Sequence, residues 1–112
     1  MLLHGDVHHD NILAAERAPW LAIDPKGVVG DPAFDTANFL RNHLPEIPHG
    51  TEKRRIIERR IAIFVEHLAL DRDRVQQWAF ASTVLSAIWT VEDHGYGWED
   101  TIDTAEQMAA LR

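Results

Sequence analysis

The sequence predicts an α+β fold that is mainly helical, with a short β-hairpin followed by about four helices. In residues 1–35 the apolar runs are short and are broken by Gly, Pro, Asp and His. In residues 36–112 apolar side chains recur at helical spacing. The 112 residues, of which 46% are hydrophobic, provide material for one domain at most. We therefore expect loops and strands first and a helical bundle after them.

The first 35 residues contain three candidate strand segments. Leu2–Leu3 is a short apolar run that can end a strand. Residues 11–15 and 20–24 flank a polar stretch with Pro19, which is typical of a hairpin of two short strands. This hairpin would bring the polar residues before its first strand next to those after its second strand, so it predicts a site as well as a fold.

Two helices are predicted next. Asp31–Pro32 is typical of a helix start, an N-cap followed by proline at the first helical position, and apolar residues follow at Phe34, Ala37 and Leu40. A second helix begins near Thr51, with apolar side chains at steps of four, three and four: Ile57, Ile61, Phe64 and Leu68. Its other face is basic but has interleaved glutamates, and we interpret that face as solvated. The basic residues are Lys53, Arg54, Arg55, Arg59 and Arg60.

The last two helices differ in character. Residues 74–91 are apolar almost all round, which predicts a helix at the buried centre of a bundle. A final helix carries one apolar stripe, made by Trp98, Ile102, Ala105 and Ala109. Carboxylates in its first turn suit the positive end of the helix dipole.

Composition excludes several classes of protein. The chain has no cysteine, which rules out disulfide scaffolds, thiolate zinc sites and cysteine nucleophiles. A formal net charge of −7 makes nucleic acid a poor partner. There is no apolar run of the length that a membrane span needs, and the start has none of the features of a signal peptide. We expect a cytoplasmic protein that binds neither membranes nor nucleic acid.

The polar clusters His4–Asn11 and Asp24–Gly27 carry the chemistry. Phosphoryl transfer needs one carboxylate for the proton of the attacking hydroxyl, and a second carboxylate with a carboxamide to hold magnesium. Asp6 and Asn11 lie on one predicted loop, and the returning strand delivers Asp24. This spacing matches the catalytic and metal loops of kinases.

The run His4-Gly5-Asp6, with Asn11 after four further residues, resembles the catalytic loop of the aminoglycoside phosphotransferase family. Residues Asp24–Asp35 begin Asp-Pro-Lys-Gly, where protein kinases have Asp-Phe-Gly, and are similar to the streptomycin 6-kinase and hydroxyurea kinase branch. The resemblance implies a protein-kinase-like C-terminal lobe. It also implies ATP as co-substrate, Mg²⁺, and O-phosphorylation of a cationic small-molecule antibiotic such as a streptomycin-like aminoglycoside.

The resemblance also implies residue roles. Asp6 would be the catalytic carboxylate, and Asn11 and Asp24 would be magnesium ligands. His4 and Asp35 would support the catalytic loop, with Asp35 tying the first helix to it.

Kinases of this fold also have an N-terminal lobe with a Gly-rich loop and a strand lysine, and neither pattern occurs in this sequence. We therefore expect residues 1–112 to be a single partial domain that lacks the ATP-binding lobe. Residues 1–35 would hold the catalytic and metal loops and residues 36–112 the helical bundle. The face left by the missing lobe would favour self-association.

Two assignments stay open at this point. Lys26 either contacts a phosphate or lies exposed at a turn. Six carboxylates in the last third of the chain can bind a cationic acceptor, with Glu92, Asp93 and Asp100 as the candidates, or they are solvated and first-turn residues.

Two other functions compete with the kinase. The chain can be a folded but inactive kinase lobe. Alternatively, the dense His/Asp cluster can hold a transition metal in a hydrolase, although that function leaves Asn11 and Asp24 unused. The cluster consists of His4, Asp6, His8, His9 and Asp10.

Overall fold

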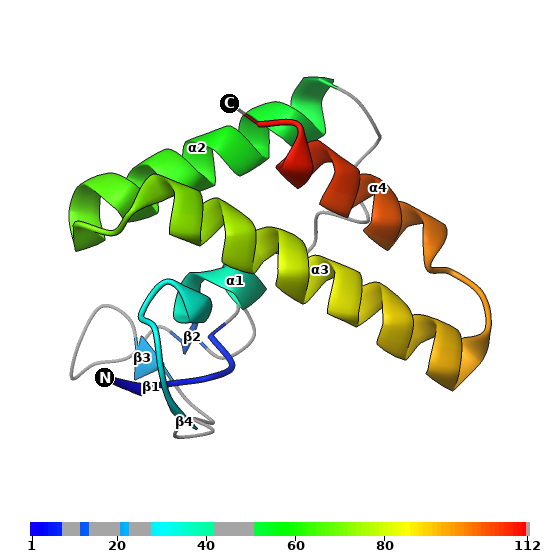
Figure 1. Ribbon diagram of the computed structural model, residues 1–112, viewed down its shortest axis with the longest axis horizontal. Coiled ribbons are helices and arrows are strands. Elements are labelled where there is room, and N and C mark those ends of the chain that lie inside the picture. Colours follow the sequence, from blue (N-terminus) through cyan, green and yellow to red (C-terminus); the bar gives the residue numbers. More distant parts are fainter. Residues whose placement is uncertain (8–11, 14–20, 23–27, 42–50, 112) are drawn as a thin grey trace.

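The computed structural model describes residues 1–7, 12–13, 21–22, 28–41 and 51–111. The described part of the chain is mainly helical, with four two-residue strands preceding four helices (Figure 1). This confirms the expected α+β class with predominant helix. No helix in these ranges combines the length and apolar content that are needed to cross a membrane.

The strands form two separate antiparallel pairs. β2 (Ile12–Leu13) pairs with β3 (Leu21–Ala22), with Ile12 opposite Ala22, so the described residues confirm the predicted hairpin. β1 (Leu2–Leu3) pairs with β4 (Val28–Val29), a strand that the sequence analysis did not predict. The two β-branched residues of β4 favour an extended backbone, and they were too short a run to be recognised.

The helices are α1 (Phe34–Arg41), α2 (Thr51–Leu68), α3 (Arg72–His94) and α4 (Glu99–Ala109). α3 crosses the centre of the molecule and packs against α1, α2 and α4 (Figure 1). The predicted start of α1 is confirmed, because Oδ1 of Asp31 accepts a hydrogen bond from the Ala33 N–H at 3.0 Å. Gly95, with a φ of 74°, ends α3 in the left-handed conformation that glycine adopts without strain.

The core lies where the four helices meet. Its fully buried side chains come from every helix: Leu40, Ile57, Ile61, Val75, Ala79 and Met108. Two positions of the predicted α2 stripe, Ile57 and Ile61, therefore face the core. Phe64 packs against the core at its edge, whereas Leu68 at the end of the helix is exposed.

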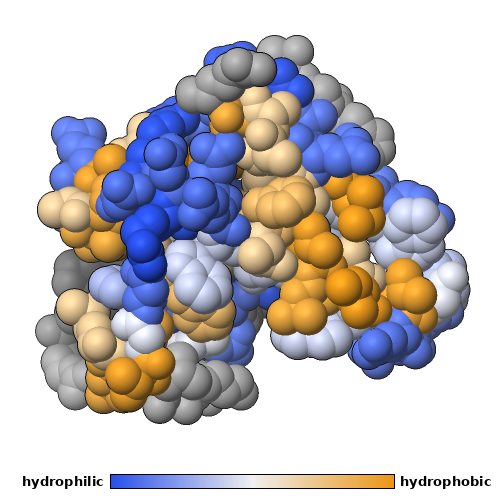
Figure 2. Space-filling model, viewed as in Figure 1, coloured by the Kyte–Doolittle hydropathy of each residue, from blue (hydrophilic) through white to orange (hydrophobic). Residues whose placement is uncertain are grey.

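The prediction that α3 lies at the centre of the bundle is confirmed by its packing against the other three helices, but the helix is buried on one side only. Its buried residues follow a single stripe: Val75, Ala79, Thr83 and Ala87. Apolar side chains on its other sides are 40–52% exposed: Phe80, Leu85, Ile88, Trp89 and Val91. Among the described elements α1 is far shorter than α3, so its packing leaves part of α3 uncovered, and orange side chains gather over α3 in Figure 2.

The interpretation of the basic face of α2 as solvated is wrong at two positions. Lys53 is fully buried, and its Nζ donates to Oδ2 of Asp103 at 2.9 Å and to Oγ1 of Thr104 at 3.2 Å. Arg60 donates to two carbonyl oxygens in the last turn of α1. These contacts join α2 to α4 and to α1. The exposed basic residues of this face are Arg54, Arg55 and Arg59.

Candidate active site

The loop that connects β1 to Asp6 is fixed by the first turn of α1. The two carboxylate oxygens of Asp35 accept hydrogen bonds from the backbone N–H groups of His4 and Gly5, each at 2.8 Å. Gly5 has a φ of 88°, a conformation that side chains on other residues disfavour. The glycine therefore lets consecutive N–H groups point at one carboxylate.

Two side chains hold Asp6 itself. Nδ1 of His4 accepts a hydrogen bond from the Asp6 N–H at 3.1 Å. Oδ1 of Asp6 accepts from the side-chain amide of Asn38 at 3.3 Å. The structure thus brings His4, Asp6 and Asp35 together, and it adds Asn38, which the sequence analysis did not single out.

Arg41 connects this group to α3. Its guanidinium donates to Oδ1 of Asn38 at 2.6 Å, and to the hydroxyls of Ser82 and Ser86 at 3.3 Å each. Burial lowers the pKa of Arg41 below its ordinary value, and the negative charge of Asp6 opposes that shift. The spacing of three residues from Asp35 to Asn38 to Arg41 was a signal that all three lie on neighbouring parts of one helix.

A pocket of about 300 Å³ opens beside Asp6, between α1 and α3. Phe34 and Trp78 meet edge to face in it, with ring centroids 5.3 Å apart. The lining combines one carboxylate, one guanidinium and several apolar side chains, as in many small-molecule sites. The lining residues are Gly5, Asp6, Phe34, Asn38, Arg41, Trp78, Ala81, Ser82, Leu85 and Trp89.

Asp31 fixes one of these aromatic residues. Its Oδ2 accepts from Nε1 of Trp78 at 3.2 Å and from Nε of Arg74 at 2.7 Å. Its pKa is lowered below the ordinary value, mainly by the hydrogen bond from the Ala33 N–H and then by those from Arg74 and Trp78. One carboxylate therefore starts α1 and also orients the indole of Trp78.

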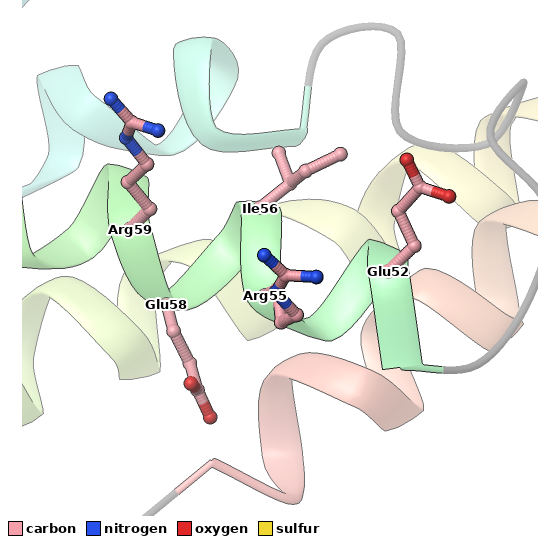
Figure 3. A pocket seen from close by; sticks show the side chains of 5 residues that line it. All are labelled: Glu52, Arg55, Ile56, Glu58 and Arg59. Carbon is pink, nitrogen blue, oxygen red and sulfur yellow. The ribbon is translucent and has the colours of Figure 1, made fainter.

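A larger hollow of about 490 Å³ lies on the outer face of α2, away from Asp6. Its lining side chains all come from that helix, and they carry charges of both signs. Figure 3 shows Glu58 pointing away from Glu52, Ile56 and the arginines. No set of groups converges there, so the site beside Asp6 is the stronger candidate.

The predicted acceptor carboxylates do not line the pocket. Glu92 and Asp93 are exposed on α3, one turn beyond Trp89, and Asp100 is exposed in the first turn of α4. Asp103, another of the six acidic residues in this part of the chain, is paired with Lys53.

Residues 1–94 match the family described as aminoglycoside/hydroxyurea antibiotic resistance kinase. The chain belongs to this family. The match confirms the resemblance that the two polar loops indicated. It covers β1 to the end of α3 and therefore includes every described residue of the site.

Comparison with individual relatives supports the same family assignment. The chain is 44% identical over 92 residues to streptomycin 6-kinase of Streptomyces griseus, and 41% identical to that of Streptomyces glaucescens. It is 39% identical over 92 residues to hydroxyurea phosphotransferase of Kitasatospora aureofaciens. These matches cover 82% of this chain, which spans 30%, 30% and 25% of the three relatives. No solved structure matches the chain.

Several residues that the family resemblance singles out lie outside the described residues. They are Asn11, Asp24 and Lys26. His8, His9 and Asp10, which belong to the alternative transition-metal cluster, also lie outside the described residues. The described ranges contain no group of three or more His, Cys, Asp or Glu placed to hold a metal. The pairing of Ile12 with Ala22 joins two strand residues that lie one position from Asn11 and two positions from Asp24 in the sequence.

Proposed function

We propose that this chain forms the kinase-like C-terminal lobe of an ATP-dependent phosphotransferase that acts on a hydroxyl of a small-molecule antibiotic. One observation carries the proposal: in a chain of an antibiotic kinase family, Asp6 lines a pocket and lies on a loop whose backbone is hydrogen-bonded to Asp35. A carboxylate in this position can contact a hydroxyl held in the pocket.

Asp6 acts as the catalytic carboxylate in this proposal. It accepts the proton of the acceptor hydroxyl as the hydroxyl oxygen bonds to the γ-phosphorus and the bond to the departing ADP oxygen breaks. Asn38 holds one oxygen of the carboxylate, and the bond from the Asp6 N–H to His4 fixes the backbone of the same residue. These contacts limit the rotation of Asp6 and keep it directed at the pocket.

Asn11 and Asp24 would hold Mg²⁺, because carboxylate and amide oxygens are the ligands that this ion prefers. The bound ion neutralises negative charge on the outer phosphates of ATP. The β2–β3 pairing supports a joint role, since Ile12 directly follows Asn11 and Ala22 stands two residues before Asp24. Lys26 would contact a phosphate.

A cationic antibiotic of the streptomycin kind is the proposed acceptor, in keeping with the names of the relatives. Glu92 and Asp93 follow Trp89 on α3 at helical spacing, so they extend the pocket side of this helix. The carbonyl end of α3 adds negative potential there. Asp100 would contribute from the first turn of α4. We place the reaction in the cytoplasm, where ATP is available.

The test is phosphorylation of streptomycin with MgATP by the whole phosphotransferase that contains this lobe, followed by mass spectrometry. Asp6→Asn should lower turnover by about 10²–10⁴-fold, because the amide keeps the shape but takes no proton. The matched control is Asp73→Asn, an exposed carboxylate at the start of α3, which should leave turnover unchanged.

Full turnover by Asp6→Asn would remove Asp6 from the reaction. A folded whole protein that forms no product with any acceptor would instead favour the inactive kinase lobe.

A further inference from the structure

Asn38 lies between two charged groups that have opposite hydrogen-bonding character. Its Nδ2 donates to Oδ1 of Asp6 at 3.3 Å, and its Oδ1 accepts from Nη2 of Arg41 at 2.6 Å. An ionised carboxylate only accepts hydrogen bonds, and a guanidinium only donates them. The carboxamide therefore satisfies both neighbours in one orientation only, with its nitrogen towards Asp6.

This orientation depends on Arg41. If the carboxamide turned over, its oxygen would lie against the carboxylate of Asp6, where two acceptors with negative charge repel each other. Both hydrogen bonds of the carboxamide have a charged partner, and the bond from Arg41 is the shorter one. Arg41 keeps its positive charge at neutral pH, although burial lowers its pKa. Loss of this arginine would therefore release the oxygen end of the carboxamide.

Arg41 is itself held by α3. Its Nε and Nη1 donate to the hydroxyls of Ser82 and Ser86, each at 3.3 Å. These serines lie one turn apart on the same face of the helix. Because a guanidinium is planar and rigid, contacts at two of its nitrogens fix the direction of the third. The serines of α3 therefore determine where Nη2 meets Asn38.

We propose that Arg41 is a positioning residue for the phosphoryl transfer, which fixes the carboxamide of Asn38 and through it directs the carboxylate of Asp6 at the acceptor hydroxyl. The inference rests on the proposed function and deepens it, because it adds a residue that acts without touching the reacting atoms. A carboxylate takes a proton only within hydrogen-bonding reach of the hydroxyl, and a displacement of about 1 Å can cost about 10²-fold in rate.

The experiment measures kcat and the KM values for streptomycin and MgATP in the whole phosphotransferase that contains this lobe. Arg41→Met should lower kcat about 10–100-fold and change neither KM by more than about twofold, because the substrates still bind but Asp6 is no longer directed. Arg41→Lys should recover part of the loss, since an ammonium also only donates hydrogen bonds. The matched control is Arg54→Met, an exposed arginine of α2 bonded to Gln107, which should have the kcat of wild type.

A double-mutant cycle tests whether Arg41 acts through Asn38. Asn38→Leu should lower kcat about as much as Arg41→Met does, and the double variant should lower it no further, because the second change removes a contact that is already lost. Effects that multiply in the double variant would overturn the proposal, since Arg41 would then act by another route. A raised KM for streptomycin at unchanged kcat would also overturn it, because Arg41 would then contact the acceptor.

A second readout does not depend on turnover. The side-chain amide signal of Asn38 in ¹H–¹⁵N spectra, identified by its absence in Asn38→Leu, should shift in both Arg41→Met and Asp6→Asn. A signal that does not move in Arg41→Met would overturn the proposal. If circular dichroism shows Arg41→Met to be unfolded, the variant with both Ser82→Ala and Ser86→Ala decides. It keeps the guanidinium but releases it from α3, so kcat should fall and the amide signal should shift.

The two proposals fail separately. A whole protein that shows the expected amide shifts but phosphorylates no acceptor contradicts the proposed function alone. A whole protein that phosphorylates streptomycin at the wild-type rate in Arg41→Met contradicts the role of Arg41 alone.

Discussion

Replacement of Asp35 by asparagine tests how strongly α1 holds the loop that carries Asp6. The carboxylate accepts two backbone hydrogen bonds at 2.8 Å, one from His4 and one from Gly5. Asparagine keeps one acceptor oxygen, and its amide group would face the second N–H as another donor. Since a hydrogen bond to a charged group contributes about 1.5–3 kcal/mol, we expect Asp35→Asn to lower the free energy of unfolding by about 2 kcal/mol.

The assay is urea unfolding together with hydrogen exchange of the His4 and Gly5 amides, which should become faster than in the wild-type chain. Asp73→Asn is the matched control, because it removes a carboxylate from the first turn of α3, where no such loop is held. It therefore corrects for the loss of favourable charge at a helix N-terminus. Unchanged exchange at both amides in Asp35→Asn would refute the idea that this carboxylate fixes the loop.

Three further predictions concern packing, pH and association. Asp103→Asn should lower the free energy of unfolding by about 2–3 kcal/mol in urea unfolding, because it leaves the charge of the fully buried Lys53 uncompensated. Lys53→Met should cost less, since it removes that charge and fills the space; an equal loss would contradict this account. Because the pKa of Asp31 is lowered in the folded protein, its contacts stabilise the fold fully at pH values above the ordinary pKa of 3.8. This contribution is lost as the pH falls through the lower pKa of the folded state. The stability difference between wild type and Asp31→Asn should therefore shrink in acid, and a difference independent of pH would exclude this linkage. Exposed apolar residues of the β1–β4 pair, Leu2 at 72% and Val29 at 79%, should promote self-association that Val29→Lys reduces in sedimentation velocity, whereas a monomeric wild-type chain at high concentration would contradict it.

Local sequence signals were sufficient for most of the fold. The start of α1 followed from Asp31–Pro32, because capping depends on residues that are adjacent in the chain. The exposure of one side of α3 could not be predicted in this way. Apolar residues on all sides of a helix show what the helix is able to bury, but they do not show how much of its surface the neighbouring elements cover. Lys53 was misassigned for a related reason: its partner Asp103 is 50 residues away.

The residues of the candidate site also include some that the sequence indicates and some that it does not. Asp6 and Asp35 belong to recognisable patterns of residues at short spacing, so the sequence alone indicates them. Asn38 acquires its role when the loop with Asp6 packs on α1. Arg41 acquires its role when α1 packs on α3, which puts it next to Ser86, 45 residues further along the chain. No local pattern reports a contact of that kind.

The single face that α1 presents to the loop and the pocket also limits how this family can diverge. Asp35, Asn38 and Arg41 hold the loop, the carboxylate of Asp6 and α3 from one helix of eight residues. Insertion of one residue within α1 would turn everything after it by about 100° and separate these three functions. Members that accept different antibiotics should therefore keep the length of α1 unchanged and vary instead on the α3 side, at positions such as Leu85 and Trp89.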